Sequence, residues 1–109
     1  MVVLFWAAWC TPSGKAIKEL DKTYEDFKKA GIEVLAISVD QDAGVASNYV
    51  KVNKIQCPTM QDAKGKISAG YGIREIPAVY VIDKQGKIRR FYKDFPGAKK
   101  LLEEAKTLT

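Results

Sequence analysis

Cys10 and Ser13 are the two residues of this chain whose types and spacing could do chemistry together. They stand in the segment Trp6-Ala7-Ala8-Trp9-Cys10-Thr11-Pro12-Ser13, where Pro12 suits the first turn of a helix because its missing N–H is not needed there. A cysteine at the start of a helix meets unpaired N–H groups and the positive end of the helix dipole, which favour the thiolate. Ser13 can donate a hydrogen bond to that thiolate, but a Cys-x-x-Ser pair cannot close an internal disulfide. We therefore expect Cys10 to be a single nucleophilic sulfur, with an inert cysteine as the alternative.

The amino-acid composition excludes several other kinds of catalytic site. The chain has 2 cysteines and no histidine. A zinc site of Cys and His ligands would need more ligands than these, and Cys-His or Ser-His-Asp catalysis is impossible without an imidazole. We expect no metal and no cofactor, so that any chemistry rests on thiols.

Cys57 is the second cysteine. A cysteine in an apolar stretch is most often buried and inert, and we favour this interpretation. The alternative is a thiol that resolves mixed disulfides at Cys10, for which the two α-carbons must approach within about 7 Å. The segment Cys57-Pro58-Thr59 is similar to the peroxidatic loop of peroxiredoxins, but Lys54-Ile55-Gln56 before it lacks the threonine that such a site needs. Thiol peroxidase activity is therefore disfavoured.

Length and composition indicate one domain. The 109 residues are 47% hydrophobic and 28% charged, which allows one core and leaves no room for a second domain. No apolar run approaches the ~20 residues of a membrane-spanning helix, and residues 1–6 lack the basic start and cleavage site of a signal peptide. We expect a monomer with a single domain over residues 1–109 and no membrane insertion.

The net charge of +5 comes from 18 Lys and Arg against 13 Asp and Glu, and the excess is densest in residues 84–100. A nucleic-acid surface would add aromatic stacking platforms or a reader motif to such a segment, and we find none. We expect a solvated basic face and no nucleic-acid partner, with weak attraction to acidic partners as the alternative.

Apolar runs and turn signals predict the elements that must position these residues. Strands are expected at 2–5, 32–39, 57–60, 78–82 and 87–92, and helices at 12–30, 43–53, 66–71 and 96–108. The apolar run 32–39 is typical of a parallel strand covered by helices, so the first three elements form a β-α-β unit. The turn 83–86 joins the last two strands as an antiparallel hairpin. The expected buried edge of helix 43–53 is Val45, Tyr49 and Val52.

This order of elements resembles the thioredoxin superfamily and, within it, the TlpA-like branch of thiol-disulfide oxidoreductases. The segments that carry the resemblance are 4–10 (LFWAAWC), 34–40 (VLAISVD), 57–62 (CPTMQD) and 71–86 (YGIREIPAVYVIDKQG). The resemblance covers nearly the whole chain and implies an α/β thioredoxin fold. Its central mixed β-sheet is flanked by helices, in the order β-α-β, an inserted α/β pair, then β-β-α.

The resemblance also implies a substrate site around Cys10. It implies a cis bond between Ile76 and Pro77 that faces the cysteine, with the backbone of Ile76 free to pair with an extended substrate as an added strand. An ordinary trans proline is the alternative. The catalytic positions so implied are Cys10, Ser13 and Pro77. The substrate-binding positions are Trp9, Thr11, Pro12 and Ile76.

The chain departs from the family pattern at the residues of the reactive site. Ser13 replaces the second cysteine, and Lys15 comes one place later than the usual Arg or Lys. Ala16 and Lys18 stand where the branch often has Glu and Pro, and Leu4 replaces a buried acid. Family members also usually carry an N-terminal extension ahead of the first strand. We therefore expect a domain trimmed at its N-terminus.

On this resemblance we expect a thiol-disulfide oxidoreductase that acts on protein or small-molecule thiols and disulfides. Mixed disulfides at Cys10 would be resolved by an external thiol, such as glutathione or a partner protein. Three explanations of Ser13 stay open: a natural single-thiol enzyme, a Cys-to-Ser substitution made to trap partners, and a domain that has lost turnover. A redox-inactive domain that binds extended segments at Ile76 and Pro77 is the alternative from another class. TlpA-like relatives mostly work outside the bacterial cytoplasm, so the resemblance implies a periplasmic location.

Overall fold

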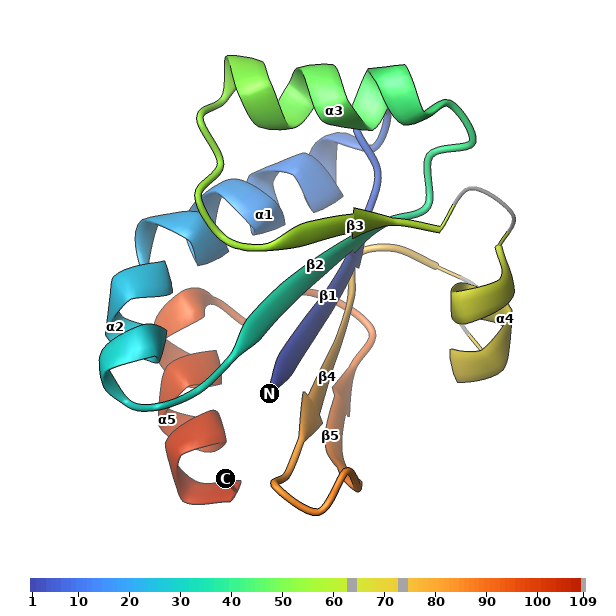
Figure 1. The fold of residues 1–109 in the computed structure, drawn as a ribbon. Coiled ribbons are helices and arrows are strands. Elements are labelled where there is room, and N and C mark those ends of the chain that lie inside the picture. The colour runs from blue at the N-terminus through green and yellow to red at the C-terminus, as the bar shows by residue number, and fades with distance from the viewer. Residues whose placement is uncertain (63–64, 73–74, 109) are drawn as a thin grey trace.

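Helices and strands both occur along the whole described part of the chain, which is residues 1–62, 65–72 and 75–108 of the computed structural model (Figure 1). The strands are β1 (Val2–Trp6), β2 (Val34–Ser38), β3 (Thr59–Gln61), β4 (Ala78–Ile82) and β5 (Ile88–Tyr92). The helices are α1 (Thr11–Lys22), α2 (Tyr24–Lys29), α3 (Ala43–Val52), α4 (Lys66–Tyr71) and α5 (Ala98–Leu108). The expected α/β order is confirmed.

The strands form one mixed sheet in the order β3-β2-β1-β4-β5. β1 lies at its centre, parallel to β2 and antiparallel to β4, and its residues are all buried. β4 and β5 form the expected antiparallel hairpin. Because β1 and β2 are parallel, with Trp6 opposite Ser38, the carboxyl ends of both strands meet at one edge of the sheet. The loop that carries Cys10 and the segment after Ser38 therefore start side by side.

The two faces of the sheet are covered differently. α1, α3 and α5 pack on one face, and α4 packs on the other (Figure 1). On the first face the largest buried side chains are Leu4, Trp6, Phe27, Ile17, Leu20 and Leu101. On the second face the rings of Phe5, Tyr71 and Tyr80 lie with centroids 4.8 to 6.2 Å apart. Each fully buried large apolar side chain contributes about 1.5–3 kcal/mol, so these clusters hold β1 in place.

The helix expected over residues 12–30 is two helices, because the chain breaks at Thr23. The backbone of Thr23 has φ −103° and ψ 7°, outside helical geometry. Its hydroxyl donates to the carbonyl oxygen of Leu20 at 3.0 Å. A threonine that bonds back to the preceding turn competes with the helical ladder. Phe27 in α2 nevertheless reaches the core.

The buried edge expected for α3 is wrong at Val45 and Val52, which are 45% and 68% exposed. The contact face instead runs through Ala46, which is buried, and through Tyr49 and Val50, which pack on the core. The ring of Tyr49 lies 5.2 Å from that of Trp6. This aromatic contact fixes the rotation of α3 about its own axis.

Long-range side-chain bonds set two further boundaries. β3 begins two residues later than expected, because the N–H groups of Gln56 and Cys57 donate to Oδ1 of Asp21 at 2.8 and 2.9 Å rather than to a strand. α5 begins at Ala98 rather than at residue 96. The N–H of Ala98 donates to Oε2 of Glu19 at 2.6 Å, so that a carboxylate of α1 fixes the start of the last helix.

Candidate functional site

Cys10 stands between β1 and α1, at the capping position of the helix. Its backbone is extended, with φ −104° and ψ 106°, and Pro12 lies in the first turn that follows. The carbonyl oxygen of Cys10 accepts the N–H of Gly14 at 2.9 Å, which closes that turn. The side chain is half-buried. The sulfur therefore lies at the positive end of a helix of 12 residues, as expected.

The Cys10 sulfur faces the loop that precedes β4. Its thiol donates to the carbonyl oxygen of Ile76, with Sγ and O 3.9 Å apart. The peptide bond between Ile76 and Pro77 is cis. Ile76 is half-buried and Pro77 is buried. The structure thus brings together the cysteine and the proline loop that the family resemblance implied to share one site.

Exposed side chains surround the sulfur on its helix side. Trp9 is 69% exposed, and Thr11 and Pro12 are exposed as well. Lys15 also points into solvent. Trp9, Thr11 and Pro12 are thus accessible to a molecule that approaches Cys10.

The position of Ser13 differs from the expectation that its hydroxyl can donate a hydrogen bond to the Cys10 thiolate. The side chain is fully buried, and its Oγ accepts the N–H of Ala7 at 3.0 Å. The same hydroxyl lies 2.9 Å from the carbonyl oxygens of Ala7 and of Cys10, and it can donate its one proton to either of them. Among the described residues it makes no hydrogen bond to Cys10 Sγ. Ser13 therefore ties the end of β1 to the first turn of α1, a role that its position in the motif did not indicate.

Asp40 is a site residue that sequence reasoning missed. It is 2% exposed, and the N–H of Ala8 donates to its two carboxyl oxygens at 3.0 and 3.2 Å. The Ser38 hydroxyl donates to Oδ2 at 2.6 Å. Asp40 belongs to the segment 34–40 that carries the family resemblance, but its contact with the loop before Cys10 depends on the pairing of β1 with β2.

Gly14 occupies the place where the family pattern has Arg or Lys. A Cβ atom at this position would lie 2.6 Å from Oη of Tyr49. Gly14 therefore lets the tyrosine of α3 approach the first turn of α1. Tyr49 also packs against Trp6, so this approach joins α3 to both the helix and the strand that flank Cys10.

Cys57 lies at the opposite end of α1. It is 3% exposed, and its N–H is bound by Asp21 in the last turn of the helix. Burial and the neighbouring Asp21 carboxylate raise the pKa of Cys57 from 9.0 to about 12. Asp21 follows Cys10 by eleven residues, and at ~1.5 Å per helical residue this places the two sites roughly 16 Å apart. Both cysteines are free, and Cys57 is too far away to resolve a disulfide at Cys10.

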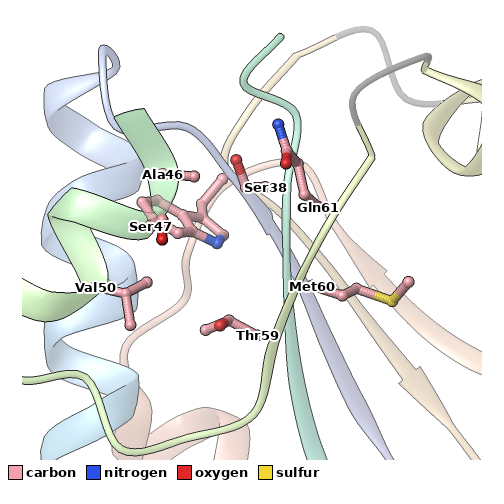
Figure 2. Close-up of a pocket in the computed structure, with 8 residues that line it drawn as sticks. Ser38, Ala46, Ser47, Val50, Thr59, Met60 and Gln61 are labelled. Atoms are coloured by element: carbon pink, nitrogen blue, oxygen red, sulfur yellow. The ribbon is translucent and has the colours of Figure 1, made fainter. Parts of the chain in front are cut away.

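A cavity of about 280 Å³ lies between α3 and the strands β2 and β3, away from Cys10. Figure 2 shows Ala46, Ser47 and Val50 of α3 on one side and Thr59 and Gln61 on the other. The buried Trp6 also lines it. Its lining includes neither Cys10 nor the Ile76-Pro77 loop. It is therefore separate from the surface around the cysteine.

Among residues 1–62, 65–72 and 75–108, no group of three or more His, Cys, Asp or Glu side chains is arranged to hold a metal ion. None of the helices there is long and apolar enough to cross a membrane.

The sheet order, the helices on its two faces and the cysteine opposite a cis proline define a thioredoxin-fold protein. A profile of the AhpC/TSA family matches residues 1–91, and the chain belongs to that family. Within the superfamily it is a TlpA-like member, as the sequence resemblance implied.

Similar proteins come from bacteria. The chain is 30% identical over 105 residues to "Thiol-disulfide oxidoreductase ResA" of Bacillus thuringiensis subsp. konkukian, covering 96% of this chain and 61% of that relative. It therefore spans less than two thirds of this relative. A thiol:disulfide interchange protein of the thioredoxin family from Chlorobium tepidum is 26% identical, with a TM-score of 0.84 over 98% of this chain and 77% of that one. StoA from Bacillus subtilis, at 24% identity and a TM-score of 0.85 over 94% of this chain and 78% of its own, shares the fold.

Proposed function

We propose that this protein is a thiol-disulfide oxidoreductase that works through Cys10 alone. The observation that carries the proposal is the contact of Cys10 Sγ with the carbonyl oxygen of Ile76 at 3.9 Å, at the start of α1. Nucleophilic cysteines are commonly found at such helix N-termini, beside unpaired N–H groups and an exposed surface. The activity named for the ResA relative supports the same chemistry.

The reaction begins when the Cys10 thiolate attacks one sulfur of a substrate disulfide. A bond forms between Sγ and that sulfur, the substrate S–S bond breaks, and the other substrate sulfur leaves as a thiolate. A dithiol enzyme would now use its second cysteine. Here residue 13 is a serine, and Cys57 is buried at the far end of α1. The mixed disulfide therefore persists until another thiol arrives.

An external thiol completes the cycle. As a thiolate it attacks the substrate sulfur of the mixed disulfide, forms a new disulfide with it and releases Cys10 as a thiolate. A second external thiol then displaces the substrate from that new disulfide. The substrate disulfide is reduced to two thiols, and the two external thiols are oxidised to one disulfide. Glutathione or a partner protein can supply this pair of electrons.

The exposed surface beside Cys10 supports extended substrates. Trp9 offers an apolar platform that is 69% exposed, and Thr11 and Pro12 are exposed next to it. The carbonyl oxygen of Ile76 lies 3.9 Å from the sulfur. We assign substrate binding to these four residues, and the conformation of the site to Ser13 and Pro77.

Mass spectrometry after exposure to oxidised glutathione tests the proposal. We expect one glutathione adduct on Cys10 that remains until a reducing thiol is added. Cys10→Ala should give no adduct, and the matched variant Cys57→Ala should give the wild-type result. Absence of an adduct on the folded wild-type protein, or an adduct on Cys57, would refute the proposal.

The exposed Trp9 also favours a second candidate, a domain that binds extended segments without redox turnover. In that case Cys10→Ser should leave peptide binding intact, and no reduction of a disulfide substrate should be measurable with excess glutathione. Trp9 fluorescence, with Trp6 buried as an internal reference, would report the binding.

A further inference from the structure

The loop between β1 and α1 is held by two buried side chains. The N–H of Ala7 donates to Ser13 Oγ at 3.0 Å, and the N–H of Ala8 donates to the carboxyl oxygens of Asp40 at 3.0 and 3.2 Å. The N–H of Cys10 then turns back to the carbonyl oxygen of Ala7 at 3.2 Å. Ser13 follows Cys10 by only three residues, whereas Asp40 comes from the segment that follows β2. The loop that presents the sulfur is therefore fixed to β2 through Asp40.

Asp40 is itself fixed on several sides. The hydroxyl of Ser38 donates to its Oδ2 at 2.6 Å and accepts its N–H at 3.0 Å. Nε2 of Gln61 donates to its carbonyl oxygen at 2.9 Å. The carboxyl group is 2% exposed and forms no ion pair with a described residue. Within the described part of the chain, the partners of the carboxyl group are thus two hydrogen-bond donors, the N–H of Ala8 and the hydroxyl of Ser38 at the end of β2.

The sheet register explains why Asp40 reaches Ala8. Trp6 and Ser38 lie opposite one another at the ends of β1 and β2, and the N–H of Val39 donates to the carbonyl oxygen of Trp6 at 2.9 Å. Each chain then continues by two residues, which brings Asp40 beside Ala8. From Ala8 the chain needs only two more residues to reach the sulfur.

We propose that Asp40 is a positioning residue for Cys10. By accepting the N–H of Ala8 it holds the loop so that Sγ faces Ile76 at the start of α1. This inference rests on the proposed function, because it assigns Asp40 a part in the reaction of Cys10. Asp40 acts through the backbone and does not touch the sulfur.

Asp62 provides a matched control. It is also buried, at 5% exposure, and its carboxyl oxygens accept the N–H groups of Ile67 and Ser68 at 3.1 and 2.8 Å. These bonds hold the start of α4, on the other face of the sheet. Asp62→Ala therefore removes a buried carboxyl group that accepts backbone N–H groups, as Asp40→Ala does, without touching the Cys10 loop.

The test measures the rate at which Cys10 forms a mixed disulfide with oxidised glutathione, under conditions where circular dichroism shows each variant folded. We expect Asp40→Ala to slow the reaction about tenfold, the rate equivalent of one hydrogen bond, and Asp62→Ala to change it less than about twofold. Asp40→Asn keeps an oxygen that can accept the N–H of Ala8, so it should restore most of the rate. Equal rates in Asp40→Ala and Asp62→Ala, or no recovery in Asp40→Asn, would overturn the inference.

A readout that does not need the reaction separates this inference from the proposed function. Hydrogen exchange at the Ala8 amide, followed by NMR, should accelerate in Asp40→Ala and stay slow in Asp62→Ala. If wild-type protein forms no adduct, the proposed function fails, while Ala8 exchange still reports whether Asp40 holds the loop.

If Asp40→Ala does not fold, Ser38→Ala removes the hydroxyl that holds the carboxyl group. It should slow adduct formation about threefold, by weakening one bond of the network. An unchanged rate in that variant would also overturn the inference.

Discussion

The Sγ atom of Cys10 lies 3.9 Å from the carbonyl oxygen of Ile76, a residue that follows it by 66 positions in the chain. The contact joins the loop after β1 to the loop before β4, and these two strands are antiparallel neighbours in the sheet. Cys10 thus follows the central strand β1, and Ile76, whose backbone we propose to bind substrate, precedes the neighbouring strand β4.

Ser13→Cys should convert the protein from an adduct-forming thiol into a dithiol. We expect an internal disulfide between residues 10 and 13, and a glutathione adduct on Cys10 that disappears without added thiol. Adduct lifetime by mass spectrometry and reduction of a disulfide substrate would both report the change. A persistent adduct in this variant would show that Gly14, Ala16 and Leu4 have altered the site beyond a single replacement.

Ser13→Ala should destabilise the protein, because the buried N–H of Ala7 loses its acceptor. We expect a loss of about 1–3 kcal/mol in the free energy of unfolding, measured in urea. Ser47→Ala is the control, since Ser47 is exposed and should change the free energy by less than about 0.5 kcal/mol. Similar small effects in both variants would contradict the role assigned to the Ser13 hydroxyl.

Gly14→Ala should destabilise, although glycine to alanine inside a helix ordinarily stabilises by about 1 kcal/mol. The added Cβ would lie 2.6 Å from Oη of Tyr49, within a packed contact between α1 and α3. In a Tyr49→Phe background this oxygen is gone, so the same substitution should become stabilising. Urea unfolding of the four proteins of this double-mutant cycle checks the reversal of sign. A stabilising effect of Gly14→Ala in the wild-type background would disprove the steric role.

Cys57 should make stability fall in alkaline solution. Burial and Asp21 raise its pKa from 9.0 to about 12 in the folded protein. Between these pH values the unfolded chain loses the thiol proton and the folded chain keeps it, so that rising pH favours unfolding. We expect wild-type protein to lose more unfolding free energy from pH 8 to pH 10 than Cys57→Ala does. Parallel pH profiles for the two proteins would contradict the raised pKa.

Local patterns in the sequence were enough to predict the parts of the site that are close in the chain. The proline after Cys10 and the apolar run before it indicate a strand, a turn and a helix, and the structure places them so. The contact with Ile76 came from the family resemblance, because no local pattern links residues 66 positions apart. The role of Asp40 was missed for the same reason, since it depends on the register between β1 and β2.

Which side of α3 faces the core is a second feature that the sequence pattern alone could not predict. Val45, Tyr49 and Val52 have helical spacing, and so do Ala46, Tyr49 and Val50, so that two overlapping faces fit the apolar pattern. The structure selects the second face because Tyr49 must fit between Trp6 and Gly14. Only the shape of the neighbouring elements decides between them. The burial of Cys57, by contrast, follows from its apolar surroundings and was predicted.

The distance between the two thiols along α1 has a consequence for oxidation. A folded molecule cannot link its own cysteines, because Cys57 lies beside Asp21, roughly 16 Å along α1 from Cys10, and is covered by the core. When an oxidant is added to pure folded protein, a disulfide between protein sulfurs can therefore form in one way only, between the half-buried Cys10 side chains of two molecules. The product would be a covalent dimer symmetric about Cys10, and any bridge that contains Cys57 would mark chains that had unfolded first.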